Sequence, residues 1–485
     1  MKRSHETTGS DHANSDLYRL IPSLHELLLT PGFARLLEAE SRESALCGAR
    51  VVLSRLKREI ADGHHTPASL QREIDSVSVK VAETLAQGFR YSLRRVINAT
   101  GVVLHTNLGR APLSAAALKH ILDTAGGYCN LEFDVTSGER SRRDDHAEDL
   151  LLRVLRGPDG ATTEHSAVVV NNCAAATFLA LNTLAEGGEV IVSRGQLVEI
   201  GGGFRIPEIL AKSGAVMREV GTTNRTRLAD YENAISPATR LILRVHPSNF
   251  SMEGFVEHPG LRDLISLGKR CRVPVFDDQG TGLLTSLEPL GIGSERTLVE
   301  SFRMGSDLVA ASGDKLLGGP QCGLLIGKAD LVQSIRKNPL YRAFRADKLT
   351  YAALEATLMD YASGKTSSIP VQRMLHAATE EIFTRCESIC HRINSAELSA
   401  EPVEVSSLIG GGAAPTARLK SAAVSLRHAR LQPQALLAAL RRLEPPVIGR
   451  ISEDAVLLDL RTVEPAFDEP LGALLQQIAR LPEDV

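Results

Sequence analysis

The chain of 485 residues, 43% of them hydrophobic, is long enough to form two or three domains with buried cores. Its formal net charge of -3 excludes a uniformly basic nucleic-acid-binding protein, so any RNA contact has to use a local basic patch. Its seven cysteines, odd in number and scattered, exclude a disulfide framework and are typical of a reducing cytosol.

The N-terminus of the chain is polar. Residues 1–6 are followed by no apolar stretch, and no run in the chain approaches the length of a membrane span. We therefore expect a cytoplasmic protein without a membrane partner. Residues 1–18 contain too few apolar groups to offset the entropy of ordering, which predicts a disordered tail.

Residues 19–97 show helical periodicity. Apolar residues recur at steps of three and four, as in Val51, Leu53, Leu56 and Ile60, and Thr66 before Pro67 is a typical helix start. This pattern predicts a small N-terminal helical domain. Residues 1–97 hold 14 Lys and Arg against 12 Asp and Glu, a balance of +2 that only weakly supports RNA binding.

A different pattern begins near residue 98. Apolar runs alternate with helical segments, which predicts an α/β domain at 98–360 with a doubly wound, mainly parallel, seven-stranded sheet. Shorter strands and a Leu-rich helix after a long helical stretch predict a small α+β domain at 361–485. Ligands of such sheets bind outside the carboxyl ends of the strands. The seven runs are 168–170, 190–192, 216–220, 241–245, 273–276, 308–311 and 324–326.

One lysine, Lys315, lies in a glycine-rich segment between two of these apolar runs. An ammonium group beside a core is costly unless its charge is used or removed. A desolvated lysine attacks carbonyls, and the carbonyl most often found in such a site is pyridoxal 5'-phosphate, with which lysine forms a Schiff base. Lys315 is thus the candidate catalytic lysine, with a surface lysine of a hairpin as the alternative. Ser312, three residues earlier, is placed to bind the cofactor phosphate.

Two upstream segments supply the other parts of such a site. The cofactor needs a carboxylate at its pyridinium nitrogen, and the run 273–276 ends in Asp277 and Asp278, of which Asp278 is the candidate. Its phosphate needs a helix N-terminus with small residues. The run 168–170 leads into one, and there we expect the cofactor contacts Asn172, Cys173 and Ala174. The order of phosphate turn, acidic strand end and lysine is that of the aspartate-aminotransferase type of fold.

Five longer segments carry a resemblance to a known family. The chain resembles the bacterial L-seryl-tRNA(Sec) selenium transferases, also called selenocysteine synthases, over roughly residues 20–480. The resemblance implies pyridoxal-phosphate fold type I, an N-terminal domain that contacts tRNA, and a homodecamer built from dimers; a dimer is the minimum the sequence supports. The matching segments are 97–110, 192–202, 219–226, 312–321 and 342–348.

The resemblance also implies the reaction. Seryl-tRNA(Sec) and selenophosphate give selenocysteyl-tRNA(Sec) and phosphate, by β-elimination to aminoacrylyl-tRNA followed by selenium addition. Lys315 removes the α-proton, and Asp278 keeps the ring nitrogen charged. Asp314 assists proton movement, unless it is only a carboxylate of the hairpin.

The selenium donor is a small polyanion, so its pocket needs arginines, whose planar forks match such oxygens. Arg110, Arg342 and Arg345 are the candidates, the last two one turn apart if their segment is helical. Arg142 or Arg143, of which we favour Arg143, is a further anion contact. Thr222 and Thr223, which follow the run 216–220, complete the expected substrate site.

Other interpretations remain open. Cys386, Cys390 and His391 have helical spacing, but they lack the second ligand pair of a structural zinc site, so we expect no metal. The same sheet and lysine also serve lyases that act on a free amino acid or an amino sugar acid. A cofactor-sensing regulator would need a DNA-binding module, for which the N-terminal helices show no pattern.

Overall fold

The structure, a computed structural model, describes residues 10–88, 91–157, 164–200, 203–293 and 295–480. The chain divides into two compact units, Met1–Arg95 and Val96–Val485. No helix in the described ranges combines the length and the apolar character that crossing a lipid bilayer requires.

The first unit consists of helices around their own apolar core, which includes Phe33, Leu53 and Leu56. Threonines start two of the helices, because the Thr30 and Thr66 side chains accept hydrogen bonds from backbone N–H groups three residues later. The helices are α1 (Ser10–Leu20), α2 (Leu24–Leu28), α3 (Pro31–Ala39), α4 (Arg42–Ala61), α5 (Pro67–Asp75) and α6 (Val77–Gly88).

Helix α1 begins inside residues 1–18, the segment for which the sequence predicts a disordered tail. Residues 1–9 lie outside the described part of the chain, but Ser10–Leu20 is helical. The physical reason is one apolar side chain: Leu17 is only 6% exposed and packs against Ile60 and Leu70. Burial of a leucine contributes about 1.5–3 kcal/mol, which the sequence does not reveal because Leu17 stands in a polar segment.

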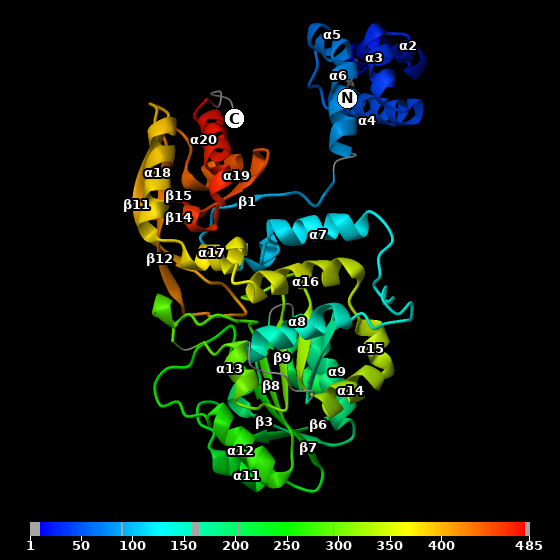
Figure 1. The fold of residues 1–485 in the computed structure, drawn as a ribbon. Coiled ribbons are helices and arrows are strands. Elements are labelled where there is room, and N and C mark those ends of the chain that lie inside the picture. Colours follow the sequence, from blue (N-terminus) through cyan, green and yellow to red (C-terminus); the bar gives the residue numbers. More distant parts are fainter. Residues whose placement is uncertain (1–9, 89–90, 158–163, 201–202, 294, 481–485) are drawn as a thin grey trace, which may run out of the picture. The chain divides into compact units, whose positions relative to one another are not determined.

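The second unit is built on the expected seven-stranded sheet, and the predicted fold class is confirmed (Figure 1). The strand order is β2-β10-β9-β8-β7-β3-β6. Strand β10 runs antiparallel to β2 and β9, and the other four pairs are parallel. The strands are β2 (His165–Val170), β3 (Glu189–Ser193), β6 (Val216–Val220), β7 (Thr239–Val245), β8 (Val275–Gly280), β9 (Leu308–Ser312) and β10 (Gly323–Lys328).

Helices cover both faces of this sheet. Alternate residues of β2 belong to different cores: Val168 and Val170 pack with one set of helices, Ala167 and Val169 with another. The first face carries α9 (Cys173–Ala185), α10 (Ile206–Lys212) and α14 (Ala329–Lys337). The opposite face carries α8 (Asp145–Arg156), α11 (Leu228–Ala234), α12 (Leu261–Cys271), α13 (Leu298–Arg303) and α16 (Lys348–Ala362).

The C-terminal part has a separate four-stranded antiparallel sheet, ordered β11-β12-β15-β14, with its own core. Two short strands flank Gly449: β13 (Val447–Ile448), which pairs with β1 (Ile97–Asn98), and β14 (Arg450–Ser452), which pairs with β15. Its other elements are α18 (Thr379–Ile393), β11 (Leu398–Leu408), β12 (Arg418–His428), α19 (Pro433–Arg442), β15 (Ala455–Asp459) and α20 (Asp468–Ala479).

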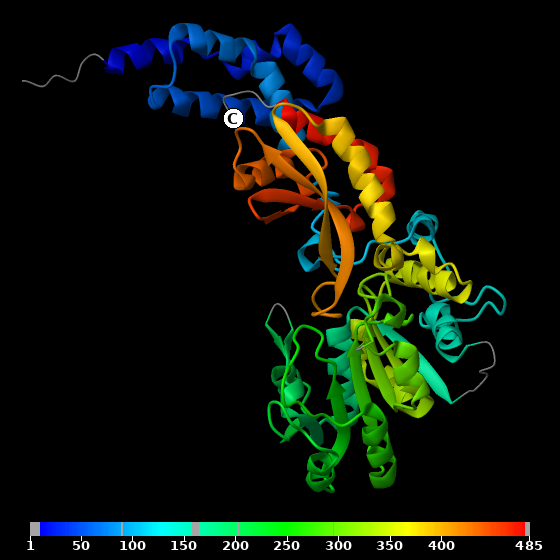
Figure 2. The same ribbon diagram turned by 90° about the vertical axis from the view of Figure 1, so that its left-hand side faces the viewer.

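The hairpin of β11 and β12 extends from this small sheet toward the large one (Figure 2). Its connecting loop is buried: Ile409, Ala413 and Ala414 pack with Leu104 and Leu316 in one apolar cluster. The loop 409–414 therefore belongs to the surroundings of Lys315, although it comes from the C-terminal part of the chain.

Candidate active site

A cavity of about 310 Å³ lies at the carboxyl ends of the large sheet. It is formed by the segments that follow β2, β7, β8 and β9, as expected for a sheet of this type. Its lining residues are Arg110, Asn172, Cys173, Ala174, Thr177, Val245, His246, Ser248, Asp278, Gly280, Ser312, Asp314, Lys315 and Gln321.

Lys315 lies in this cavity with 7% of its surface exposed. The loop between β9 and β10 holds its backbone, because Leu316 N donates to Thr281 O at 2.9 Å and Gly318 N donates to Lys315 O at 3.0 Å. Burial lowers the pKa of Lys315 below its usual value, since a charged amine is poorly solvated there. A lowered pKa increases the fraction of the amine that is neutral and therefore nucleophilic.

Asp278 faces the same cavity and is also buried. Thr177 Oγ1 donates a hydrogen bond to Asp278 Oδ2 at 2.9 Å, and Cys173 Sγ lies 3.8 Å from Oδ1. Burial raises the pKa of Asp278 to about 6. A carboxylate whose charge is poorly solvated is well suited to receive a cationic ligand group.

Asp277 points away from the cavity, because successive side chains of β8 lie on opposite faces of the sheet. Its carboxylate accepts a hydrogen bond from Arg244 Nη1 at 2.7 Å and lies 3.5 Å from Arg296 Nη1. Asp277 does not line the cavity, so the geometry favours Asp278 for the pyridinium partner.

The turn after β2 meets the N-terminus of α9 at the cavity wall. Asn172 caps this helix, with Oδ1 accepting from Ala175 N at 2.8 Å, and Cys173 and Ala174 are its first residues. N–H groups in a first helical turn have no partner within the helix and attract anions. Gly323 packs against the turn, and a Cβ there would lie 2.2 Å from Asn172 O. Ser312 lies at the end of β9 and lines the same cavity.

Arg110 and Asp314 form an ion pair in the cavity. Arg110 Nη1 lies 2.7 Å from Asp314 Oδ2, and both side chains are mostly buried. Arg110 follows Gly109, whose φ of 89° is left-handed, and its own φ is 59°. This turn aims the guanidinium at the segment that carries Lys315, where it compensates the charge of Asp314.

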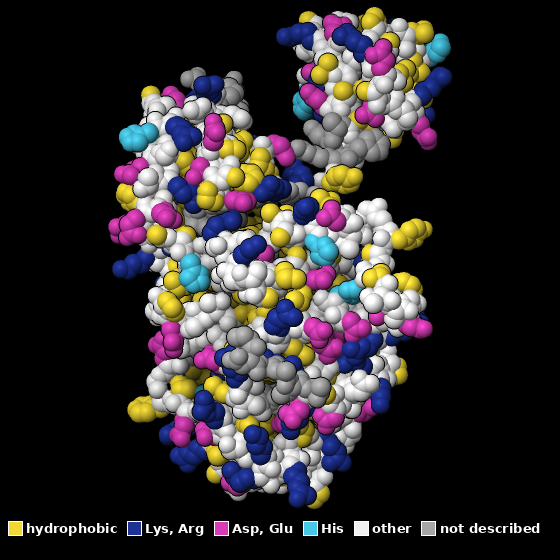
Figure 3. Space-filling view, in the orientation of Figure 1, with side chains coloured by type: hydrophobic (Ala, Val, Ile, Leu, Met, Phe, Trp, Pro, Cys, Tyr) yellow, Lys and Arg dark blue, Asp and Glu magenta, His cyan; other side chains and the backbone are white. Residues whose placement is uncertain are grey.

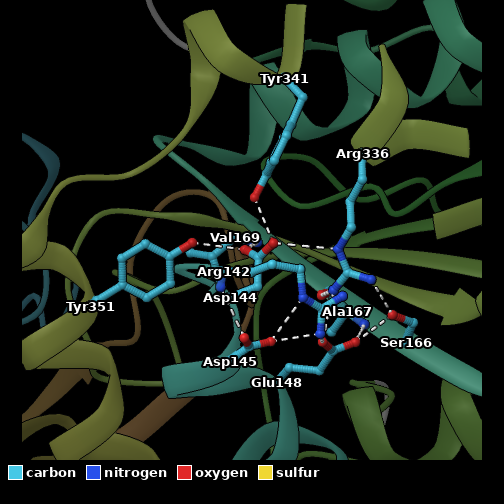
Figure 4. Close-up of polar contacts among 10 residues, drawn as sticks. All are labelled: Arg142, Asp144, Asp145, Glu148, Ser166, Ala167, Val169, Arg336, Tyr341 and Tyr351. Atoms are coloured by element: carbon cyan, nitrogen blue, oxygen red, sulfur yellow. Dashed lines mark hydrogen bonds and ion pairs between the residues drawn. The ribbon is translucent and has the colours of Figure 1, made fainter. Parts of the chain in front are cut away.

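A polar network behind the site holds β2 in place (Figure 4). Asp144 accepts hydrogen bonds from Tyr341 Oη at 2.6 Å and Tyr351 Oη at 2.7 Å, and Glu148 accepts from Arg336 Nη2 at 2.8 Å. The network connects α8, β2, α14, α15 (Pro339–Phe344) and α16. Burial and the Asp144 carboxylate raise the pKa of both tyrosines, which therefore stay protonated and donate hydrogen bonds to Asp144.

A family model described as SelA, L-seryl-tRNA selenium transferase, matches residues 96–464. The chain belongs to the L-seryl-tRNA selenium transferase family. Relatives that carry this name align with nearly the whole chain. A relative named L-seryl-tRNA(Sec) selenium transferase from Aquifex aeolicus is 44% identical over 437 residues, 89% of this chain and 93% of the relative. One with the same name from Moorella thermoacetica is 43% identical over 470 residues, 95% and 97% of the two chains.

One solved structure shows the shared fold. D-glucosaminate-6-phosphate ammonia-lyase superposes with a TM-score of 0.55 and 19% identity, covering 82% of this chain and 98% of that one. This likeness concerns the fold alone, which is the aspartate-aminotransferase type expected from the sequence. The relatives above, at more than twice that identity, are transferases, so membership of the selenium transferase family favours the transferase over the lyase alternative.

Several residues expected at the substrate site of the selenium transferase lie outside the cavity. Arg143 Nε donates to Glu132 Oε1 at 2.7 Å, and Arg345 Nη1 donates to the same oxygen at 3.2 Å. Helix α15 ends at Phe344, so Arg342 and Arg345 do not share the expected helical turn. Arg342 is exposed at the surface.

Thr222 and Thr223 are exposed in a turn after β6. The Thr222 hydroxyl donates to Arg225 O at 3.0 Å, which closes this turn. Neither threonine lines the cavity. Among the described residues, no group of three or more His, Cys, Asp or Glu side chains could hold a metal ion.

The cavity also contains residues that the sequence analysis did not assign. Thr177 lies one helical turn after Cys173, and this i+4 spacing was an available signal. Ser248, by contrast, follows β7 without any motif that marks it, and Gly412 reaches Lys315 only through the folding of the C-terminal hairpin.

Proposed function

We propose that this chain converts L-seryl-tRNA(Sec) to L-selenocysteyl-tRNA(Sec), with pyridoxal 5'-phosphate as cofactor and selenophosphate as the selenium donor. The observation that carries the proposal is the buried Lys315, which shares one cavity with Asp278 and with the N-terminus of α9. Family membership supports the substrate, because the relatives are named for it.

The residues of the cavity fit this cofactor. Lys315 would hold its aldehyde carbon, Asp278 its pyridine nitrogen, and the first turn of α9 with Ser312 its phosphate. Asp278 Oδ2 already accepts a hydrogen bond from Thr177. Its other oxygen, Oδ1, has only the weak donor Cys173 Sγ beside it, at 3.8 Å. This oxygen is the one available to a pyridinium N–H.

When bound, the cofactor supplies an electron sink for the charge that develops at the serine α-carbon. Lys315 Nζ would take the α-proton as a neutral amine, the form that burial favours. Asp278 would keep a proton on the ring nitrogen. Asp314 lies beside Lys315 and is neutralised by Arg110, so its carboxylate remains available to assist proton movement without repelling the donor anion.

A polyanionic donor is bound more tightly by two guanidiniums than by one. Arg110 is the arginine that lines the cavity in this chain. Arg342 and Arg345 lie on the segment 342–348, outside it, and we place Arg342 of a second copy at the donor site. Arg342 is exposed, whereas Arg345 is paired with Glu132.

A homo-oligomer, at least a dimer, is part of the proposal. Helices α7 (Ala115–Ala125) and α16 pack together and expose Leu118, Leu122, Leu349 and Met359. Figure 3 shows apolar side chains over these helices. Exposed apolar side chains on two helices that pack together favour a contact surface here. A decamer, a cytoplasmic location and contact of the N-terminal domain with tRNA belong to the same proposal.

The test is direct conversion. The protein, loaded with pyridoxal 5'-phosphate, is incubated with seryl-tRNA(Sec) and selenophosphate, and selenocysteine is released from the tRNA and measured. We expect product from the wild type and none from Lys315→Ala, which also loses the cofactor adduct trapped by borohydride. A wild type that binds the cofactor but forms no selenocysteyl-tRNA would contradict the proposal.

A further inference from the structure

The turn that carries Lys315 has two buried carbonyl groups without a backbone partner. Leu316 and Leu317 follow the lysine directly and are fully buried. Neither of their carbonyl oxygens accepts a hydrogen bond from a backbone N–H of the described residues. Because a buried carbonyl left unpaired is costly, each of the two needs a partner from another part of the chain.

Two side chains from the helices that follow the large sheet are these partners. Gln372 Nε2 donates to Leu316 O at 2.8 Å, and Tyr361 Oη donates to Leu317 O at 3.0 Å. Gln372 Nε2 also donates to Tyr361 Oη at 3.0 Å, so the bonds form one connected network. Burial raises the pKa of Tyr361, which keeps its hydroxyl protonated and able to donate.

The same helices pack closely against the turn. Tyr361 lies at the end of α16, and Gln372 lies in the first turn of α17 (Pro370–His376). Gly318 has a φ of 76°, and a Cβ there would lie 2.5 Å from Cγ2 of Ile369, the residue before α17. The backbone of the turn is therefore fixed both by hydrogen bonds and by a close contact.

Neither Tyr361 nor Gln372 lines the cavity, so neither side chain touches a ligand bound there. Both act on the backbone next to Lys315, which decides where Nζ lies. To attach the cofactor, Nζ must reach its aldehyde carbon: a carbon–nitrogen double bond forms, the carbon–oxygen bond breaks, and the oxygen leaves as water with both amine protons. Because a fixed amine loses less freedom on attachment than a mobile one, a rigid turn strengthens the covalent link.

We propose that Tyr361 and Gln372 are positioning residues that hold Lys315 Nζ within reach of the cofactor aldehyde. The inference rests on the proposed function, in which Lys315 forms this link. The two side chains stabilise the covalent link and contribute nothing to the binding of the ring and the phosphate, which we assign to Asp278 and the N-terminus of α9. An effect confined to the link distinguishes positioning from a general role in stability.

The first experiment titrates the cofactor-free protein with two ligands in a calorimeter. Pyridoxal 5'-phosphate forms the link, whereas deoxypyridoxine 5'-phosphate, in which a methyl group replaces the aldehyde, binds through its ring and phosphate alone. We expect Tyr361→Phe to weaken the affinity for pyridoxal 5'-phosphate about fivefold and to leave the affinity for the analogue unchanged. Equal losses for the two ligands overturn the inference, and so does an unchanged affinity for pyridoxal 5'-phosphate.

Gln372→Leu is an independent variant, which removes the donor to Leu316 O and keeps a side chain of similar size. It should show the same selective loss for pyridoxal 5'-phosphate. Tyr351→Phe is the matched control, because Tyr351 also lies on α16 but its hydroxyl donates to Asp144, at 2.7 Å, and not to the turn. We expect Tyr351→Phe to leave both affinities unchanged. A loss for pyridoxal 5'-phosphate as large as that in Tyr361→Phe overturns the inference.

Trapping of the cofactor by borohydride separates the two levels. A wild type in which Lys315 traps no cofactor contradicts the proposed function itself. A wild type that traps the cofactor, together with a Tyr361→Phe variant that binds it equally tightly, removes the positioning role alone.

Discussion

Two neighbouring carboxylates at the end of β8 have opposite consequences for stability. Asp277 is compensated by Arg244 and Arg296, whereas Asp278 is held by neutral donors in a buried cavity. The pKa of Asp278 is raised to about 6, so its ionised form destabilises the folded protein. The favourable, neutral form is fully present below the unfolded pKa near 3.8 and is lost as pH rises through 6.

Asp278→Asn should therefore stabilise the cofactor-free protein at pH 7.5. We expect a gain in the free energy of unfolding of about 3 kcal/mol at most, which shrinks as pH falls toward 4. Urea denaturation at the two pH values measures it. Asp277→Asn is the control and should destabilise the protein, because it leaves Arg244 and Arg296 without their shared carboxylate. Equal effects of the two variants would contradict the assignment of their environments.

At the scale of an element, helix α9 packs on the large sheet and also places its N-terminus at the cavity. Its N-terminus stands at the end of β2, where Asn171 N also donates to Phe344 O at 2.8 Å. Asn172 caps the helix and orients the N–H groups that we assign to the cofactor phosphate. The same side chain thus contributes to stability and to cofactor binding.

Asn172→Ala should cost about 1 kcal/mol of stability and also weaken the binding of pyridoxal 5'-phosphate to the cofactor-free protein. Thr297→Ala removes the equivalent cap of α13, where Thr297 Oγ1 accepts from Glu300 N at 3.0 Å. It should cost similar stability and leave cofactor affinity unchanged. Denaturation and a fluorescence titration with the cofactor distinguish these results. Cofactor affinity that falls equally in both variants would mean that α9 has no special part in phosphate binding.

At the scale of the whole molecule, Arg110 is the one arginine among the described residues that line the cavity. If a second copy supplies Arg342, two inactive proteins should complement each other. We expect Lys315→Ala and Arg342→Ala to be inactive alone in selenium transfer, and a mixture that exchanges subunits to regain part of the activity. No recovery from a mixture shown by mass spectrometry to contain hybrids would place Arg342 elsewhere.

The apolar surface of α7 and α16 gives a second test at this scale. Leu122 is 73% exposed on α7, and Leu29, which is 74% exposed in the first unit, is a matched control. Leu122→Asp should weaken the oligomer, because a charge would be buried in the contact. Leu29→Asp should not. Sedimentation velocity measures the assembly, and an unchanged oligomer in Leu122→Asp would exclude this surface.

The sequence predicted what depends on local pattern. The strands that compose the sheet appear as apolar runs because both faces of a parallel sheet are buried. Chain order placed Asn172, Asp278 and Lys315 at strand ends, and parallel topology then brings these ends together. Thr66 before Pro67 marked the start of α5 for a similarly local reason, its capping hydrogen bond.

Tertiary structure decided what depends on partners distant in the chain. Arg143 and Arg345 are arginines and so are able to bind an anion, but both form ion pairs with Glu132. The choice of Asp278 over Asp277 follows from the side of β8 on which each lies. Gly412 stands 97 residues after Lys315 in the sequence, and only the fold of the β11–β12 hairpin places it beside the amine. Periodicity records which residues are buried, whereas the energy of an ion pair or a close contact depends on a neighbour that the sequence does not name.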